Sequence, residues 1–191
     1  MQRAANHTQS MIGRAGFAAF AFVGLCAMAA PHVSTRTLEK LPTPLPLPYN
    51  QGQPAMAAVD AAFAKAKAGD KRVIVDLGGN WCGWCRILAG VMALPEVKPF
   101  VEANFEVVSV DVSSKKGQTD RNLAVVNRFG MQKVKGFPWL VVAEPDGKVL
   151  ASSSDVTDER HQTPQAMVDW LAKFAKRPAV RTAAVGGVGR A

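Results

Sequence analysis

Apolar residues divide the chain into alternating helical and extended segments. They recur every three or four positions over residues 54–68, which predicts an amphipathic helix that ends at Gly69. A β-branched run follows over residues 72–77, and its continuous apolar character is typical of a strand covered on both faces. The first helix and the first strand are therefore adjacent in sequence.

The remaining segments repeat these two patterns. Helices are expected from the cysteine-containing segment to Pro95 and over residues 96–104, 123–129 and 164–175, and strands over residues 105–111, 139–143 and 149–151. Pro145-Asp146-Gly147 is a turn signal between the last two strands, which predicts a hairpin. Helices that alternate with strands imply parallel crossovers, and a late hairpin adds an antiparallel edge. We expect one α/β domain over residues 54–177, with a mixed sheet of four or five strands flanked by helices.

Composition and charge agree with a folded domain. The 191 residues are 48% hydrophobic and 20% charged, which is globular in character. The formal net charge is +8, and it falls to +6 without residues 1–29, which carry two arginines and no acids. No basic run is interleaved with aromatic residues, so no nucleic-acid partner is expected.

The N-terminus has the pattern of an export signal. Arg14 precedes an uncharged apolar stretch, and the small residues of Ala27-Met28-Ala29 follow it, which predicts a signal peptide over residues 1–29. The alternatives are an uncleaved membrane anchor, a buried helix, and lipidation at Cys26. Cleavage would remove Cys26, leave two cysteines in the mature chain, and leave no segment for stable membrane insertion.

Two further segments lie outside the predicted domain. Residues 30–53 contain alternating prolines over 42–48, which favour polyproline II and indicate a semi-rigid Pro-rich linker. A ligand for a proline-recognition domain is the alternative interpretation of this run. Residues 178–191 are rich in Ala, Gly and Arg, and they are expected to form a disordered tail.

Cys82 and Cys85 carry the candidate chemistry. A redox enzyme needs a thiolate nucleophile and a second thiol close enough to resolve the mixed disulfide, and a spacing of two residues meets both needs. At the start of a helix, Cys82 would lie near free backbone N–H groups, whereas Cys85 would lie almost one turn further inside. Half of a zinc site is the alternative, but outside the signal only His32 and His161 could add ligands of the usual type.

The segment Val73-Ile74-Val75-Asp76-Leu77-Gly78-Gly79-Asn80-Trp81-Cys82-Gly83-Trp84-Cys85 resembles the thioredoxin superfamily, and the resemblance extends over about residues 54–177. It implies a thioredoxin fold in which Asp76 lies beneath the active site and accepts a proton from Cys85. An ordinary strand-end hydrogen bond is the alternative role for Asp76. The second signature is Val134-Lys135-Gly136-Phe137-Pro138, and the resemblance implies a cis Pro138 beside the redox pair.

Several positions depart from ordinary thioredoxin. Gly78-Gly79 replaces a bulkier aromatic and small pair, Trp84 replaces a proline, and Arg86 stands where a lysine is usual. Val107 occupies a strand position at which many thioredoxins carry a lysine. Extra residues occur at 113–119 and around 131–133. These departures are more similar to exported thioredoxin-like proteins with a Trp-Cys-Gly-Trp-Cys motif.

The sequence therefore predicts an exported, periplasmic thiol:disulfide oxidoreductase that needs no cofactor and no metal. Its substrates would be protein disulfides or dithiols, reduced with electrons from a membrane or soluble thiol donor. Cys82, Cys85 and Asp76 would carry catalysis, and the substrate would dock on Trp81, Gly83, Trp84, Phe137 and Pro138. The alternatives are a thiol oxidase or isomerase that uses the same residues, a thioredoxin-like copper-delivery protein, and a catalytically silent interaction domain.

Overall fold

The computed structural model describes residues 30–177, and the expected signal peptide and tail lie outside these residues. The helices are α1 (Ala55–Ala68), α2 (Gly83–Met92), α3 (Lys98–Asn104), α4 (Leu123–Arg128) and α5 (Pro164–Ala172). The strands are β1 (Arg72–Gly78), β2 (Phe105–Asp111), β3 (Trp139–Ala143) and β4 (Val149–Ser153), and two short 3-10 helices span Leu38–Lys40 and Asp155–Thr157. Every helix and strand expected from the hydrophobic pattern is present.

The four strands form one mixed sheet in the order β2-β1-β3-β4. β1 runs parallel to β2 and antiparallel to β3, and the β3–β4 pair is the expected hairpin. Asp76 on β1 lies opposite Ser109 on β2 and Leu140 on β3. The predicted mixed α/β architecture is confirmed, with four strands.

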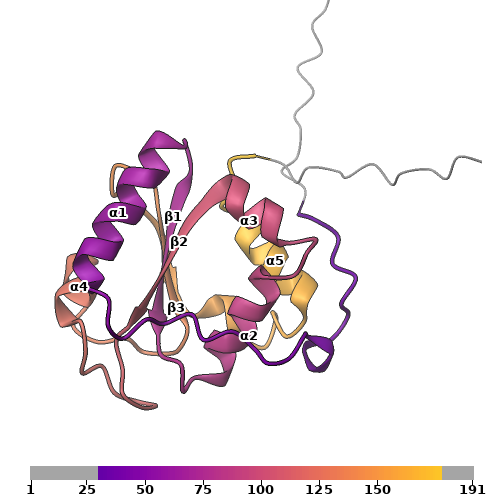
Figure 1. Ribbon diagram of the computed structural model, residues 1–191, viewed down its shortest axis with the longest axis horizontal. Coiled ribbons are helices and arrows are strands. Elements are labelled where there is room, and N and C mark those ends of the chain that lie inside the picture. The colour runs from indigo at the N-terminus through magenta and orange to yellow at the C-terminus, as the bar shows by residue number, and fades with distance from the viewer. Residues whose placement is uncertain (1–29, 178–191) are drawn as a thin grey trace, which may run out of the picture.

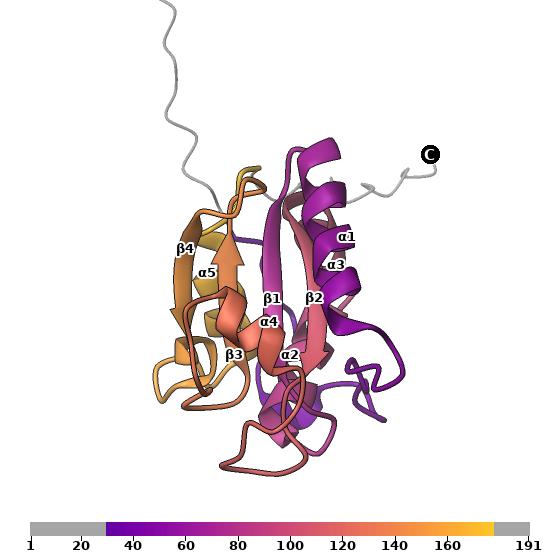
Figure 2. The ribbon, with the colours of Figure 1, turned by 90° about the vertical axis from the view of Figure 1, so that its left-hand side faces the viewer.

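Helices cover both faces of the sheet (Figure 1). α1 and α4 lie over one face, where Val73, Val75 and Leu77 of β1 enter one apolar cluster. α2, α3 and α5 lie over the other face, where Ile74 enters the second cluster. Side chains alternate along a strand, so Asp76 shares the face of Ile74 and points to the side of α2. Figure 2 shows the sheet with its strands side by side.

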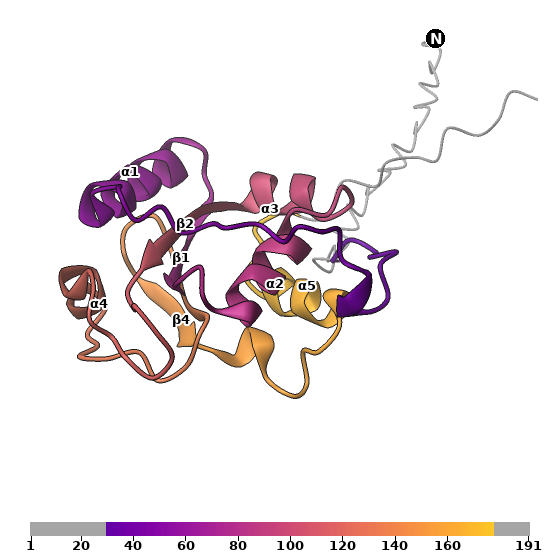
Figure 3. The ribbon, with the colours of Figure 1, turned by 60° about the horizontal axis from the view of Figure 1, so that its bottom comes forward.

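Residues 30–53, expected to act as a linker, pack against the domain along most of their length. We call this segment the N-terminal strap (Figure 3). Val33, Leu41 and Tyr49 are buried, and the amide of Val33 donates to Gln165 Oε1 of α5 at 2.8 Å. Because alternating prolines leave few amide donors for strand pairing, apolar side chains and hydrogen bonds to side chains of the domain hold the strap in place.

The helix boundaries follow local sequence signals. Thr163 caps α5 by accepting a hydrogen bond from the amide of Ala166, and Pro164 stands at the first helical position. Pro95 lies between α2 and α3, where the sequence predicted a break. Within residues 30–177, no helix is long and apolar enough to cross a bilayer.

Candidate active site

Cys82 and Cys85 lie where β1 passes into α2. Cys82 is the N-cap residue of α2, and the two sulfur atoms form a disulfide with their Cα atoms 5.3 Å apart. The amide of Cys85 donates to Cys82 Sγ at 3.2 Å, so one free N–H group of the first turn points at this sulfur. Cys85 is fully buried, whereas Cys82 keeps 5% of its surface exposed. A substrate can therefore reach Cys82 but not Cys85.

Asp76 is fully buried on the inner side of the cysteine pair. Its Oδ1 accepts a hydrogen bond from the hydroxyl of Tyr49 at 2.8 Å, and its Oδ2 accepts one from Ser109 at 3.1 Å. Burial raises the pKa of Asp76 from 3.8 to about 6, while the two hydroxyl donors act in the opposite direction. This carboxyl group therefore titrates close to neutral pH, which suits a proton acceptor.

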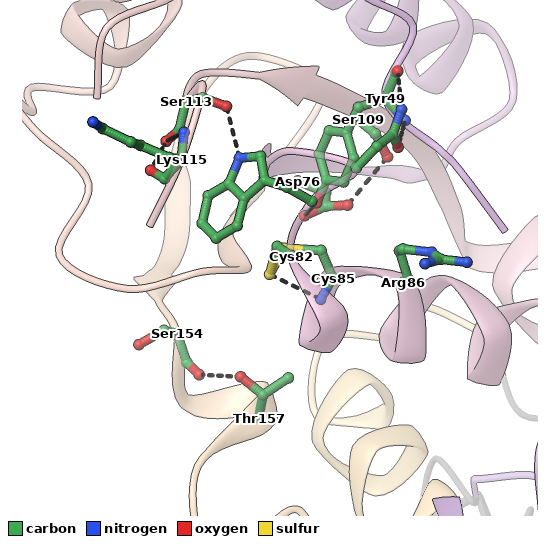
Figure 4. The surroundings of a disulfide bond; sticks show 12 residues. Tyr49, Asp76, Cys82, Cys85, Arg86, Ser109, Ser113, Lys115, Ser154 and Thr157 are labelled. Carbon is green, nitrogen blue, oxygen red and sulfur yellow. Dashed lines mark hydrogen bonds between the residues drawn. A yellow bond between two sulfur atoms is a disulfide. The ribbon is translucent and has the colours of Figure 1, made fainter. Parts of the chain in front are cut away.

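Tyr49 joins the strap to the redox centre. Its side chain is 2% exposed and packs with both cysteines (Figure 4). Burial and the Asp76 carboxylate raise the pKa of Tyr49 far above its usual range, so the phenol stays protonated and donates its hydrogen bond. Asn80 fixes the backbone at this point, because its side chain donates to the Tyr49 carbonyl at 2.8 Å and accepts from the Tyr49 amide at 3.1 Å.

Two departures from ordinary thioredoxin coincide with contacts of the strap. A Cβ atom at Gly78 would lie 2.8 Å from Cys85 Sγ and 2.8 Å from the Tyr49 ring, so only glycine leaves room for both groups. Arg86 donates to the carbonyls of Leu45 and Pro46 at 3.1 and 3.3 Å. The ring of Tyr49 thus lies next to Gly78, a position at which ordinary thioredoxins carry a larger side chain.

The outer side of the pair is open. Trp81 and Trp84 are 39% and 37% exposed, and the ring of Trp81 makes an edge contact with Phe137 at 5.4 Å between centroids. The indole of Trp81 also donates to the carbonyl of Ser113 at 2.8 Å. The Phe137–Pro138 peptide is cis, which confirms that expectation. A cavity of about 600 Å³ is lined by residues 81–84, 116–117 and 133–137.

The predicted site residues therefore occupy one region of the fold. Cys82, Gly83, Trp81, Trp84 and Phe137 line the cavity, Pro138 follows it, and Cys85 and Asp76 lie behind. Sequence reasoning missed Tyr49 and Ser109. The signal available for Tyr49 was indirect, namely the space left by the missing side chain at Gly78. Ser109 could have been found from its register opposite Asp76.

No group of three or more His, Cys, Asp or Glu side chains within residues 30–177 could hold a metal ion. The chemistry that the arrangement itself supplies is thiol–disulfide exchange, with one reachable sulfur, one buried sulfur and an adjacent carboxyl group.

Fold and site together define a thioredoxin-fold protein with a redox-active cysteine pair, and comparison with known proteins gives the same class. A model of thioredoxin-like proteins matches residues 54–145. A thioredoxin from Alicyclobacillus acidocaldarius subsp. acidocaldarius is 35% identical over 79 residues, which span 41% of this chain and 67% of that protein. The disulfide bond reductase DsbH from Chlamydia pneumoniae is 33% identical over 76 residues, which span 39% of this chain and 46% of that protein.

A solved structure extends the similarity over more of the chain. The crystal structure of a disulphide isomerase from Xylella fastidiosa Temecula1 shares 31% identity and a TM-score of 0.59, over 68% of this chain and 97% of that one. The chain therefore belongs to the thioredoxin-like family. With its cysteine pair in place, it is a protein-disulfide oxidoreductase of that family.

Proposed function

We propose that this protein is an exported disulfide reductase in which Cys82 attacks the substrate and Cys85 resolves the intermediate. The observation that carries the assignment is the asymmetry of the pair: Cys82 lines the open cavity, whereas Cys85 is fully buried beside Tyr49. An enzyme that reduces a protein disulfide needs this difference, because only one thiol has to reach the substrate.

Reduction of the substrate would proceed by two successive thiol–disulfide exchanges. The Cys82 thiolate attacks one substrate sulfur, forms a mixed disulfide and releases the other substrate sulfur as a thiolate. Cys85 then gives its proton to Asp76, and its thiolate attacks Cys82 Sγ. The Cys82–Cys85 disulfide forms, the second substrate sulfur leaves as a thiolate, and the two leaving groups take up protons. A membrane or soluble thiol donor must return two electrons to the pair after each cycle.

The inner hydrogen bonds support the role of Asp76. Burial raises the pKa of its carboxyl group to about 6, so at pH 7 it is mostly ionised and can accept a proton. Tyr49 and Ser109 hold both carboxylate oxygens in place during the transfer. On the outer side, Trp81, Gly83, Trp84, Phe137 and Pro138 would form the substrate-docking surface.

Export and the direction of electron flow are further parts of the proposal. The signal-like pattern of residues 1–29 supports delivery to the periplasm, and the similarity to a protein named disulfide bond reductase supports reduction. Measuring the reduction potential of the pair separates the directions. A value near that of thioredoxin, about −270 mV, would fit a reductase, whereas a value near about −120 mV would indicate an oxidase and a value near about −180 mV an isomerase.

Cysteine variants test the assignment of the two roles. Cys85→Ser should trap a mixed disulfide through Cys82, because the intermediate then lacks its fast intramolecular exit. Cys82→Ser should abolish both trapping and reductase activity. The trapped species are identified by mass spectrometry after non-reducing electrophoresis. Wild-type activity in Cys82→Ser would rule out this mechanism.

A further inference from the structure

Three lysines line the cavity beside Cys82 and are not used by the mechanism above. Lys116 follows β2, and Lys133 and Lys135 precede β3; all three are exposed. They come from the two loops, 113–119 and 131–133 with its flank, that hold extra residues relative to ordinary thioredoxin. Among residues 30–177, no Asp or Glu lines the cavity with them.

These lysines have no acidic partner within the part of the chain that the structure describes. None of their ammonium groups lies within 4.0 Å of a carboxylate in residues 30–177. The nearby acids are already engaged: Asp120 accepts from the amide of Ser114, and Asp111 accepts from Arg121. Three lysine charges therefore lie next to the reachable sulfur, and no carboxylate of residues 30–177 is in salt-bridge contact with them.

The two loops are tied into one surface. The amide of Val134 donates to Thr119 Oγ1 at 3.1 Å, which joins the second loop to the first. The indole of Trp81 donates to the carbonyl of Ser113, which joins the first loop to the cysteine motif. The lysines are thus presented on a connected wall, and a ligand would not have to order two independent loops.

The backbone of the second loop suits an extended peptide. Within residues 30–177, the amides of Lys135, Gly136 and Phe137 donate to no other protein group. Unpaired amides along an open segment allow another chain to pair with it, while side-chain pockets supply selectivity. A cavity of about 600 Å³ is large enough for the side chains that flank a substrate cysteine.

We propose that this cavity selects protein segments that carry acidic side chains next to the disulfide to be exchanged. This inference rests on the proposed oxidoreductase function and adds its substrate class. Carboxylates flanking the substrate sulfur would meet Lys116, Lys133 and Lys135 while the aromatic rings of Trp84 and Phe137 contact the neighbouring apolar side chains. Charge complementarity of this kind raises the association rate and rejects basic partners.

Three disulfide peptides test the proposal. They share one sequence and differ only in two flanking positions on each side, which are Glu, Gln or Lys. With the reduced protein at about 0.01 M salt, we expect the Glu peptide to react roughly tenfold faster than the Gln peptide, and the Lys peptide to react slowest. At about 0.15 M salt the differences should shrink, because the Debye length falls from about 30 to about 8 Å. Stopped-flow tryptophan fluorescence measures the second-order rate constants.

Charge-matched variants identify the residues responsible. The triple variant Lys116→Gln, Lys133→Gln, Lys135→Gln should react with the three peptides at rates that agree within about twofold. The triple variant Lys40→Gln, Lys65→Gln, Lys67→Gln removes the same charge from exposed positions outside the cavity lining and should keep the wild-type order. Equal rates in the wild type, or an unchanged preference in the cavity variant, would overturn the inference.

A binding measurement separates this inference from the proposed function. Thioether analogues of the peptides cannot exchange, so calorimetry with the oxidised protein reports affinity alone. Tighter binding of the Glu analogue together with no reduction of any disulfide would retain the acidic-substrate surface and reject the reductase. Normal reduction with equal binding of all three analogues would reject the surface and retain the reductase.

Discussion

On its inner side the Cys82–Cys85 pair meets a closed cluster in which each buried polar side-chain atom has a partner. Its outer side opens on three lysines that form no salt bridge with a carboxylate of residues 30–177. Asp76 is held by two hydroxyl donors on the inner side. On the outer side, Trp84 stands exposed. The inner side can therefore control the protonation of Asp76 and Cys85, and the outer side can control which substrate binds.

This difference gives the two sides distinct kinetic signatures. A change on the inner side should alter the chemical step and its pH dependence, because it alters when Cys85 can lose its proton. A change on the outer side should alter KM or the association rate and leave the pH dependence alone. Inner-side variants that change only KM, or outer-side variants that change the pH dependence, would contradict this division between the two sides.

The largest effect is expected for Asp76→Asn. Removing a proton acceptor usually lowers a rate by 10²-fold or more, so we expect resolution of the mixed disulfide at pH 7 to slow by about 100-fold. Single-turnover reduction followed by tryptophan fluorescence measures this rate. The initial attack by Cys82 should be unaffected and serves as the internal control. An unchanged resolution rate would reduce Asp76 to a structural role.

The same variant should stabilise the oxidised protein. Burial raises the pKa of Asp76 from 3.8 to about 6, so the folded state binds the proton more tightly than the unfolded state does. As the pH rises through this window, the unfolded state ionises first, and the wild type loses about 3 kcal/mol of unfolding free energy. The loss is absent below the window and complete above it.

Urea unfolding at pH 4 and pH 8 measures this effect in the wild type and in Asp76→Asn. The unfolding free energy of Asp76→Asn relative to that of the wild type should be higher at pH 8 than at pH 4, because the amide has no charge to bury. A difference that is the same at both pH values would mean that Asp76 is not desolvated as the structure indicates.

A smaller effect is expected for Tyr49→Phe. Loss of one hydroxyl donor raises the pKa of Asp76, so the acid limb of the pH–rate profile should move up by about one pH unit. The rate should fall several-fold at pH 6 and recover at pH 9. Ser109→Ala removes the other donor and should move the limb in the same direction. A uniform loss of rate at every pH would instead indicate that Tyr49 acts only in packing.

The smallest effect is expected for Trp84→Ala on the outer side. Trp84 is 37% exposed, so unfolding free energy should change little. Loss of one aromatic contact should raise KM for a peptide disulfide about three- to fivefold with kcat and the pH profile unchanged. Steady-state kinetics checks this, and a shifted pH profile would contradict the division between the two sides.

The sequence predicted the sheet and the cysteine site because both depend on local patterns. Continuous apolar residues identified β1, and the spacing from Asp76 to Cys82 identified the motif before the fold was known. The packing of the strap was missed because alternating prolines indicate an extended backbone and do not show which surface that backbone lies against. Its position is set by residues 31 to 132 positions away, such as Asn80, Arg86 and Gln165, and the sequence gives no such pairing directly.

The departures from ordinary thioredoxin were visible, but their cause was not. Gly78 and Arg86 look unrelated in the sequence, and in the structure one makes room for the Tyr49 ring and the other holds the strap carbonyls. The extra residues at 113–119 and 131–133 are far apart in the sequence, and only the fold shows that both segments contribute to the lining of one cavity. Positions that differ from a family pattern thus indicated where this chain adds its own contacts.

Tyr49 is the only tyrosine among the 191 residues, and its hydroxyl bonds directly to Asp76. A ¹³C label at tyrosine Cζ would therefore give a single NMR resonance from beside the cysteine pair, without any mutation. Its chemical shift should follow the ionisation of Asp76 and change again when the Cys82–Cys85 bond is opened. The chain carries an intrinsic reporter of its own redox and protonation states.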